Sequence, residues 1–198
     1  MTTDTLDHQT QRIVLHVGCG APAPGKLPAD IFPPSAWREV RLDIDAGVAP
    51  DIVASITDMA PIAESSVDAV WSAHNLEHLY AHEVLAALAE FRRVLKPDGF
   101  AVITLPDLQQ VAALVAQDRL IEPAYLSPAG PITPLDMLYG HRGAIAQGNG
   151  FMAHRTGFTA RTLEEALRQA GFPTVQVVRD GHYALWATAY RMARAEAA

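Results

Sequence analysis

The chain has 198 residues, of which 49% are hydrophobic and 19% charged, and a formal net charge of −7. This length and composition predict one soluble globular domain and exclude intrinsic disorder. A net negative charge without a cluster of lysines and arginines argues against nucleic-acid partners. The polar start is not a signal peptide, and no apolar run could span a bilayer. The single cysteine, Cys19, indicates a reducing cytoplasm.

The first half of the chain contains apolar runs that predict strands. These runs lack strict alternation, which is typical of strands buried on both faces of a sheet. The expected strands cover residues 13–17, 38–45, 51–55, 67–72 and 100–105. Apolar residues recur at helical spacing over 82–95, and the Lys-Pro-Asp-Gly sequence at 96–99 ends that helix. Residues 1–11 show no such pattern and are expected to form a disordered tail.

The remaining chain predicts two helices and a hairpin. One helix is expected at 108–117, and a second is capped by Thr159 and ends at Gly171. Residues 174–180 and 182–190 predict an antiparallel hairpin turning at Asp180-Gly181. Residues 121–150 are expected to be irregular. The pattern predicts an α/β fold with a mostly parallel sheet and an antiparallel C-terminal hairpin.

Two features at the ends of predicted strands indicate a cofactor that contains a nucleoside. Gly18-Cys19-Gly20 follows the first strand, and glycine lets the backbone approach a ligand closely. Asp43 ends the second strand, where a carboxylate can accept hydrogen bonds from ribose hydroxyls. Residues 21–34 contain five prolines, which disfavour the helix that a dinucleotide fold needs at this point. A nicotinamide-dependent reductase is therefore a weaker alternative.

Four segments resemble, in order, the motifs of the class I S-adenosylmethionine-dependent methyltransferases, and in particular those of the type 11 group. They are VLHVGCG at 14–20, RLDID at 41–45, SSVDAVWSAHNLEHL at 65–79 and EFRRVLKPDGFAVITLPDL at 90–108. The resemblance implies a Rossmann-like sheet of seven strands and S-adenosylmethionine as the cofactor. It also implies that residues 12–198 form a single methyltransferase domain.

The same resemblance implies roles for individual residues. Gly18, Cys19 and Gly20 would lie against the methionine part of the cofactor, and Asp43 would bind the ribose. The adenine would contact the segment that contains Ile56, Asp58 and Met59, where the position of the usual acid stays open. Ala73 and His74 would lie beside the sulfonium.

The predicted reaction is methyl transfer to a small polar acceptor, such as a hydroxyl of a sugar or another metabolite. A general base would assist if the acceptor is a hydroxyl, and the candidates are His74, Asp107, His141 and His154. Residues 121–158 are expected to form an insertion that acts as a lid or substrate wall, although they could equally form a homodimer contact. A non-catalytic cofactor-binding protein is the first alternative.

The sequence His74-Asn75-Leu76-Glu77-His78 also has the H-x-x-E-H pattern of one class of zinc peptidases. That chemistry needs both histidines on one face of a helix and a third protein ligand. The segment instead follows a predicted strand, and its wording is ordinary at this point in type 11 methyltransferases. We therefore assign no metal ligands, and a zinc hydrolase is a less favoured alternative.

Overall fold

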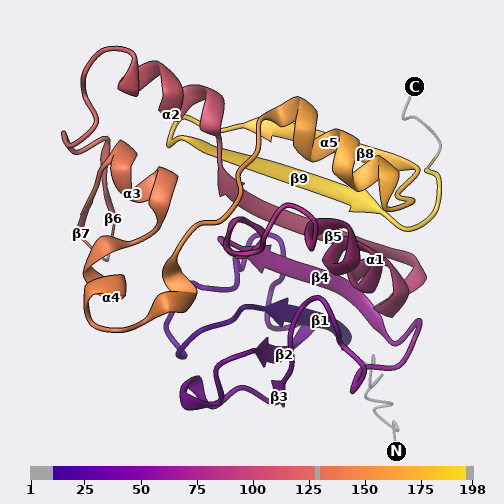
Figure 1. Cartoon of the computed structure of the whole chain (residues 1–198). Coiled ribbons are helices and arrows are strands. Elements are labelled where there is room, and N and C mark those ends of the chain that lie inside the picture. Colours follow the sequence, from indigo (N-terminus) through magenta and orange to yellow (C-terminus); the bar gives the residue numbers. More distant parts are fainter. Residues whose placement is uncertain (1–10, 128–129, 195–198) are drawn as a thin grey trace, which may run out of the picture.

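A computed structural model describes residues 11–127 and 130–194 of the chain (Figure 1). Except for Gln11, the predicted tail at 1–11 lies outside the described residues. Seven strands form one sheet in the order β3-β2-β1-β4-β5-β9-β8. The strands are β1 (Arg12–Val17), β2 (Trp37–Asp43), β3 (Ile52–Val53), β4 (Val67–Ala73), β5 (Leu95–Pro106), β8 (Thr174–Arg179) and β9 (Ala184–Tyr190).

The direction of the strands confirms the predicted fold class. Strands β1 to β5 pair in parallel, and β9 runs antiparallel to both β5 and β8. Residues 96–99, which were predicted to end the preceding helix, belong to β5, where the register with β4 shifts. The hairpin turn is longer than predicted, because β8 ends at Arg179 and β9 begins at Ala184.

Helices α1 (Val84–Val94) and α5 (Ala160–Gln169) cover one face of the sheet (Figure 1). Their apolar sides belong to the larger buried cluster, which includes Phe91 and Leu163. The side chain of Thr159 accepts a hydrogen bond from the backbone of Thr162, which confirms the predicted cap. Gly171 follows the helix with φ at +94°, a conformation that glycine adopts readily.

The loop that connects β1 and β2 covers part of the opposite face of the sheet. No helix forms in this described stretch, residues 18–36, as its prolines predicted. Phe32 is buried there, with its ring edge-on to Trp37 at a centroid distance of 5.0 Å and stacked on Phe100 at 6.2 Å. The indole nitrogen of Trp71 donates to the carbonyl of Lys26 at 2.9 Å. Aromatic packing therefore replaces a helix on this part of the sheet.

The prediction that residues 121–150 are irregular was wrong. The segment forms short strands and helical elements, and each helical element begins at a local side-chain cap. They are β6 (Tyr125–Ser127), β7 (Gly130–Ile132), α3 (Pro134–Tyr139), α4 (Arg142–Ala146) and a 3₁₀ turn at Gly150–Met152. Before the segment, α2 (Leu108–Val115) confirms the helix predicted at 108–117. Elements of three to six residues are too short to show a periodic apolar pattern. No helix in the described part of the chain is long and apolar enough to span a membrane.

We expect Phe32→Ala to lower the free energy of unfolding by roughly 3–5 kcal/mol, because it empties the centre of the aromatic cluster. Urea denaturation measures this loss. The control is Leu126→Ala, which removes a side chain from a residue that is 81% exposed, and should change stability by less than about 0.5 kcal/mol. Equal effects of the two substitutions would contradict a structural role for the loop.

Candidate functional site

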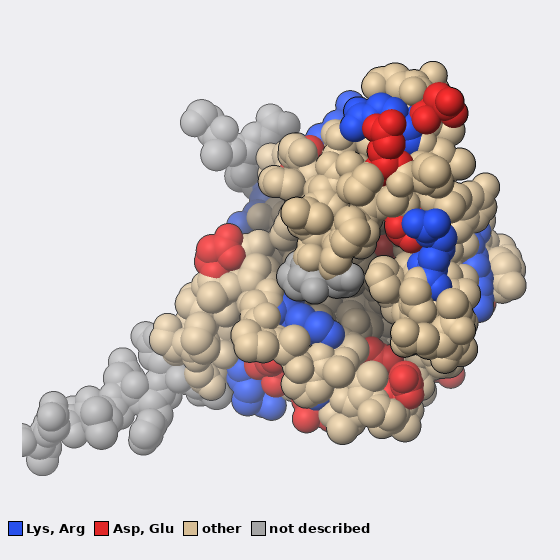
Figure 2. Space-filling model, turned by 90° about the vertical axis from the view of Figure 1, so that its left-hand side faces the viewer, with Lys and Arg blue, Asp and Glu red and all other residues tan. Residues whose placement is uncertain are grey.

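Two cavities open at the edge of the sheet where the parallel strands end, toward α3 and α4 (Figure 1). The first, of about 450 Å³, is lined by residues that include Trp71, Thr104, Tyr125, Met137, Asp180 and Trp186, and we call it cavity A. The second, of about 280 Å³, is lined by residues that include Asp43, Ile44, Ser55, Ile56, Asn75 and Arg155, and we call it cavity B. Figure 2 shows the molecule from this side, with a hollow at the centre of the face. Gly18 and His74 line both cavities.

The glycine loop after β1 lies tightly against the end of β4. Gly18 and Gly20 have φ values of +59° and +57°, in the left-handed region that favours glycine. A Cβ atom at Gly18 would lie 2.6 Å from the side chain of Asn75. Cys19, between the two glycines, is buried and lines cavity A, and burial raises the pKa of its thiol. The predicted loop therefore reaches the cavities, and its thiol stays protonated at neutral pH.

Asp43 lies at the end of β2, where the sequence predicted a ribose-binding acid. One carboxylate oxygen accepts from the backbone N–H of Gly20 at 2.7 Å, and the other from that of Asp45 at 2.9 Å. The side chain is buried, lines cavity B, and braces the glycine loop. Each carboxylate oxygen retains a lone pair that can accept another hydrogen bond.

The three residues predicted to contact the adenine lie in different surroundings in the structure. Ile56 lines cavity B, whereas Met59 is fully buried in the core and does not line it. The side chain of Asp58 is exposed and accepts from the N–H of Ala60. A tight turn, with a β-bridge from Ser55 to Asp58, directs Asp58 away from the cavity. The structure therefore brings only the first of these three candidates to cavity B.

Sequence reasoning missed Asn75 as a residue of the site. Its side chain lines cavity B, and its amide nitrogen is buried without a hydrogen-bond partner among the described residues. A buried donor without a partner is costly and rare in folded proteins. The position of Asn75 directly after His74 was the available signal, but its contact with Gly18 is visible only in three dimensions.

Ala73 ends β4 and His74 follows it, and both line cavity A, whereas His74 alone of the two also lines cavity B. His74 has φ at +49°, and its ring is about half exposed. Its Nδ1 lies 3.3 Å from Oε1 of Glu77, a carboxylate that is 1% exposed. Burial lowers the pKa of His74, but the neighbouring Glu77 outweighs this effect and raises it. Burial would raise the pKa of Glu77, but the surrounding histidines, His74 first, outweigh this effect and lower it.

Two predicted base candidates have structural partners instead. Asp107 is fully buried, caps α2 through the N–H of Gln109, and pairs with Arg179 at 2.9 Å. His141 caps α4 by accepting from the N–H of Ala144. Neither side chain lines cavity A or cavity B. The structure therefore does not place Asp107 or His141 where they could reach an acceptor.

His154, the fourth candidate, lies beside Glu77 and His78 instead of lining a cavity. Its Nδ1 is 2.9 Å from the carbonyl oxygen of Met137, and burial lowers its pKa. The helix required for the H-x-x-E-H peptidase arrangement is absent from this described segment, since residues 74–75 precede a single 3₁₀ turn, Leu76–His78. The structure therefore does not place His74 and His78 on one face of a helix, as a zinc peptidase of this class requires.

The segment predicted as an insertion lines both cavities. Tyr125 and Met137 line cavity A, and Phe151 and Arg155 line cavity B. The segment is also internally braced, because Asp136 forms a capping box with Thr133 and an ion pair with Arg142 at 2.7 Å. Burial would raise the pKa of Asp136, but hydrogen bonds from Arg142 and Thr133 outweigh it and hold the pKa far below the usual range.

The strand order, the glycine loop and the acid at the end of β2 are those of the class I methyltransferase fold. Residues 15–103 match the family model described as a methyltransferase domain. A malonyl-[acyl-carrier protein] O-methyltransferase of Laribacter hongkongensis (strain HLHK9) is 27% identical, and the match covers 74% of this chain and 60% of that protein. The chain thus spans about three fifths of the length of this relative.

Solved structures show the same fold. A protein of Pyrococcus horikoshii OT3 is 14% identical with a TM-score of 0.59, over 92% of this chain and 84% of that one. The Burkholderia thailandensis 1,6-didemethyltoxoflavin-N1-methyltransferase, solved with bound S-adenosylhomocysteine, is 19% identical with a TM-score of 0.54, over 90% and 70% of the two chains. The chain is therefore similar to the class I S-adenosylmethionine-dependent methyltransferases, in the sequence of residues 15–103 and in its fold. The cofactor of this family is S-adenosylmethionine.

We expect Asp43→Ala to weaken binding of S-adenosylhomocysteine at least roughly tenfold, since it removes a charged acceptor from cavity B and the brace of the glycine loop. Titration calorimetry with the purified chain measures this change. Asp58→Ala is the matched control and should leave the affinity unchanged, because Asp58 lies outside the cavity. A loss of affinity in the control instead would show that Asp58 is the adenine-binding acid.

Asp136→Asn should lower the free energy of unfolding by roughly 1.5–3 kcal/mol at neutral pH, because it removes charged hydrogen bonds. The pKa of Asp136 is lower in the folded chain than in the unfolded chain. Its stabilising effect is therefore present above about pH 4 and is lost as the pH falls below that value. Urea denaturation of both proteins from about pH 7 to about pH 3 should show the difference shrinking. A difference independent of pH would contradict this ion pair.

Proposed function

We propose that this chain transfers a methyl group from S-adenosylmethionine to an oxygen of a small polar acceptor. The observation that carries the proposal is the shared lining of the two cavities by Gly18 and His74. A cofactor with its nucleoside in cavity B and its sulfonium at this junction would direct the methyl group toward cavity A. Cavity A would then hold the acceptor.

The residues of cavity B fit the cofactor. The Asp43 carboxylate can accept from the ribose hydroxyls, and the apolar side chains of Ile44, Ile56 and Leu79 offer a surface for the adenine. The unpaired amide nitrogen of Asn75 is a donor for an acceptor atom of the ligand. A bound cofactor would thus satisfy a buried group that lacks a partner among the described residues.

The lining of cavity A favours a small acceptor with hydroxyl groups. Its volume of about 450 Å³ is within the range of small-molecule sites. Lys26, Asp180 and His182 supply polar groups, and the rings of Trp71 and Trp186 stack on each other at 5.6 Å. Polar groups beside aromatic faces suit a sugar or a similar metabolite hydroxyl. The name of the Laribacter relative, an O-methyltransferase, supports oxygen as the methylated atom.

Catalysis by this chain would depend mainly on positioning. S-adenosylmethionine supplies the methyl group, whose bond to sulfur breaks as its bond to the acceptor oxygen forms. Holding the two reactants at attack distance can contribute up to roughly 7–11 kcal/mol. His74 is the proposed general base, because its ring lies at the junction and Glu77 stands beside its Nδ1. The other ring nitrogen would take the hydroxyl proton, and Glu77 would stabilise the resulting imidazolium.

The segment 121–158 is proposed as the substrate wall, since it lines both cavities. Cytoplasmic location and a homodimer stay predictions from the sequence. A non-catalytic protein would bind the cofactor but would not convert it when an acceptor is present, and this is the observable that separates the two hypotheses.

His74→Asn should reduce turnover by roughly 10²–10⁴-fold while binding of S-adenosylhomocysteine changes little. Asparagine tolerates the left-handed backbone of this position better than most residues do. The assay follows S-adenosylhomocysteine release with a panel of sugars, polyols and hydroxy acids, and His82→Asn, an exposed residue nearby, is the control. Full activity of the His74 variant would rule out this base. Cofactor binding without turnover on any acceptor would favour the non-catalytic alternative.

A further inference from the structure

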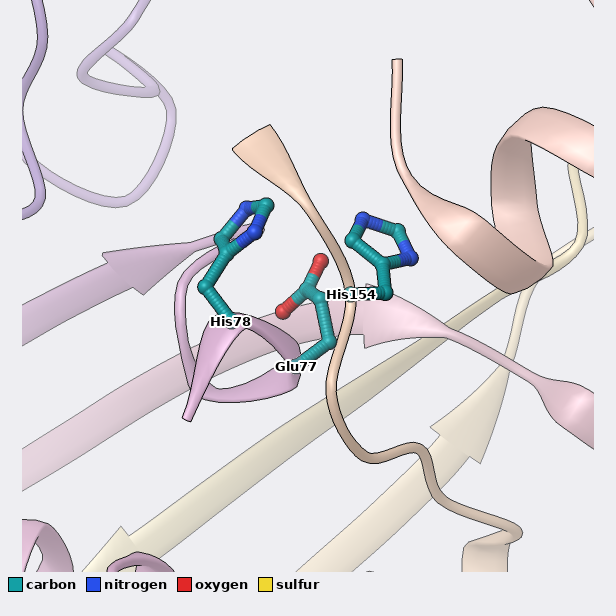
Figure 3. A group of neighbouring side chains, drawn as sticks. All are labelled: Glu77, His78 and His154. Atoms are coloured by element: carbon teal, nitrogen blue, oxygen red, sulfur yellow. The ribbon is translucent and has the colours of Figure 1, made fainter. Parts of the chain in front are cut away.

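Three side chains with metal-binding atoms converge beside cavity B. Glu77, His78 and His154 each place one such atom within 4.8 Å of the other two. Figure 3 shows the carboxylate of Glu77 between the two imidazole rings. Glu77 is buried and both histidines are partly buried. His154 comes from the segment that lines the cavities and meets the other two only through the fold.

The hydrogen bonds of this cluster leave lone pairs on both imidazoles and on the Glu77 carboxylate free to bind a cation. Nδ1 of His78 is 3.1 Å from the carbonyl oxygen of Ala153, and Nδ1 of His154 is 2.9 Å from that of Met137. A carbonyl oxygen can only accept, so each Nδ1 carries the hydrogen, and in the neutral ring Nε2 presents a lone pair. Neither carboxylate oxygen of Glu77 has a hydrogen-bond partner among the described residues.

His74 is the further titratable group beside this cluster. Its Nδ1 lies 3.3 Å from Oε1 of Glu77, but its ring is about half exposed and opens on the cavities. It therefore compensates the buried carboxylate from one side. No group in the described structure donates a hydrogen bond to either oxygen of Glu77. A buried carboxylate with an unsatisfied oxygen is costly, and a bound cation removes that cost.

We propose that Glu77, His78 and His154 bind a divalent transition-metal cation of the zinc and cobalt type. Two imidazole nitrogens and one carboxylate oxygen form a ligand set that these metals prefer, and three protein ligands leave a coordination position open. Histidines that bind metals usually donate their other ring N–H to a carbonyl or a carboxylate. His78 and His154 both have this arrangement. The ligand atoms of a tetrahedral site lie about 3.4 Å from one another, so these three groups would move closer together on binding.

The backbone holds the three residues in place independently of a metal. The carbonyl oxygen of Glu77 accepts from the N–H groups of Arg155 at 2.8 Å and Thr156 at 3.2 Å, and His154 donates its N–H to Tyr139. These bonds join the turn after β4 to the segment that carries His154. The site differs from the peptidase pattern in two ways, because His154 takes the place of His74 and Glu77 is a ligand instead of the general base. His78 also lines cavity B, so the metal would lie at its edge.

The test is metal binding by the full chain without an affinity tag, after treatment with a chelator. We expect calorimetry with zinc chloride to show about one equivalent bound, and cobalt chloride to produce visible absorption bands of a site with nitrogen and oxygen ligands. Glu77→Gln, His78→Ala and His154→Ala should each weaken zinc binding more than roughly 100-fold, beyond the loss typical of an outer-shell partner. His82→Ala removes an exposed histidine and should bind as the parent chain does.

Circular dichroism shows whether each variant folds. Zinc should raise the melting temperature of the parent chain and of His82→Ala, but not that of the three ligand variants. Absence of binding by the parent chain would overturn the proposal, whatever the variants do. Binding that survives all three substitutions, or that is lost in His82→Ala, would also overturn it by placing the metal elsewhere. A thiolate charge-transfer band with cobalt would assign the metal to Cys19 and count against this site. None of these readouts requires methyl transfer.

Discussion

The close contact between Gly18 and Asn75 determines where the two cavities meet. Strands β1 and β4 are parallel neighbours, so their carboxyl ends lie side by side. Glycine at 18 has no Cβ, and the Asn75 side chain occupies the space where one would lie. A side chain at 18 would displace the side chain of Asn75. The junction of the cavities, and with it the geometry proposed for methyl transfer, depends on this approach.

Glu77 imposes a second constraint, because a buried carboxylate must be compensated. Its side chain lies among His74, His78 and His154, and its backbone carbonyl holds the chain at 155–156. One residue therefore links the end of β4, the cavities and the segment that covers them. Protonated histidines and a bound cation are two ways to balance the same charge. They differ in whether the compensation depends on pH or on metal concentration.

Local features of the sequence were sufficient for most of the fold and part of the site. Apolar runs and glycine turns predicted the strands, and Thr159 and Gly171 marked the ends of α5 because capping needs only nearby residues. Prolines excluded a helix after β1 for the same reason. The short elements within 121–150 were missed, since their stability comes from caps and contacts, not from a repeating apolar face.

The sequence by itself determined the fold class, the glycine loop and Asp43, because these depend on the order of strands and on residues directly after them. Only the tertiary structure decided how the other polar residues are used. It pairs Asp107 with Arg179, turns Asp58 to solvent and brings His154 to Glu77. The first and the last of these outcomes join side chains that are far apart in the sequence, and the second depends on a particular turn. Such contacts leave no periodic or local pattern in the sequence, and they form only when the sheet brings the segments together.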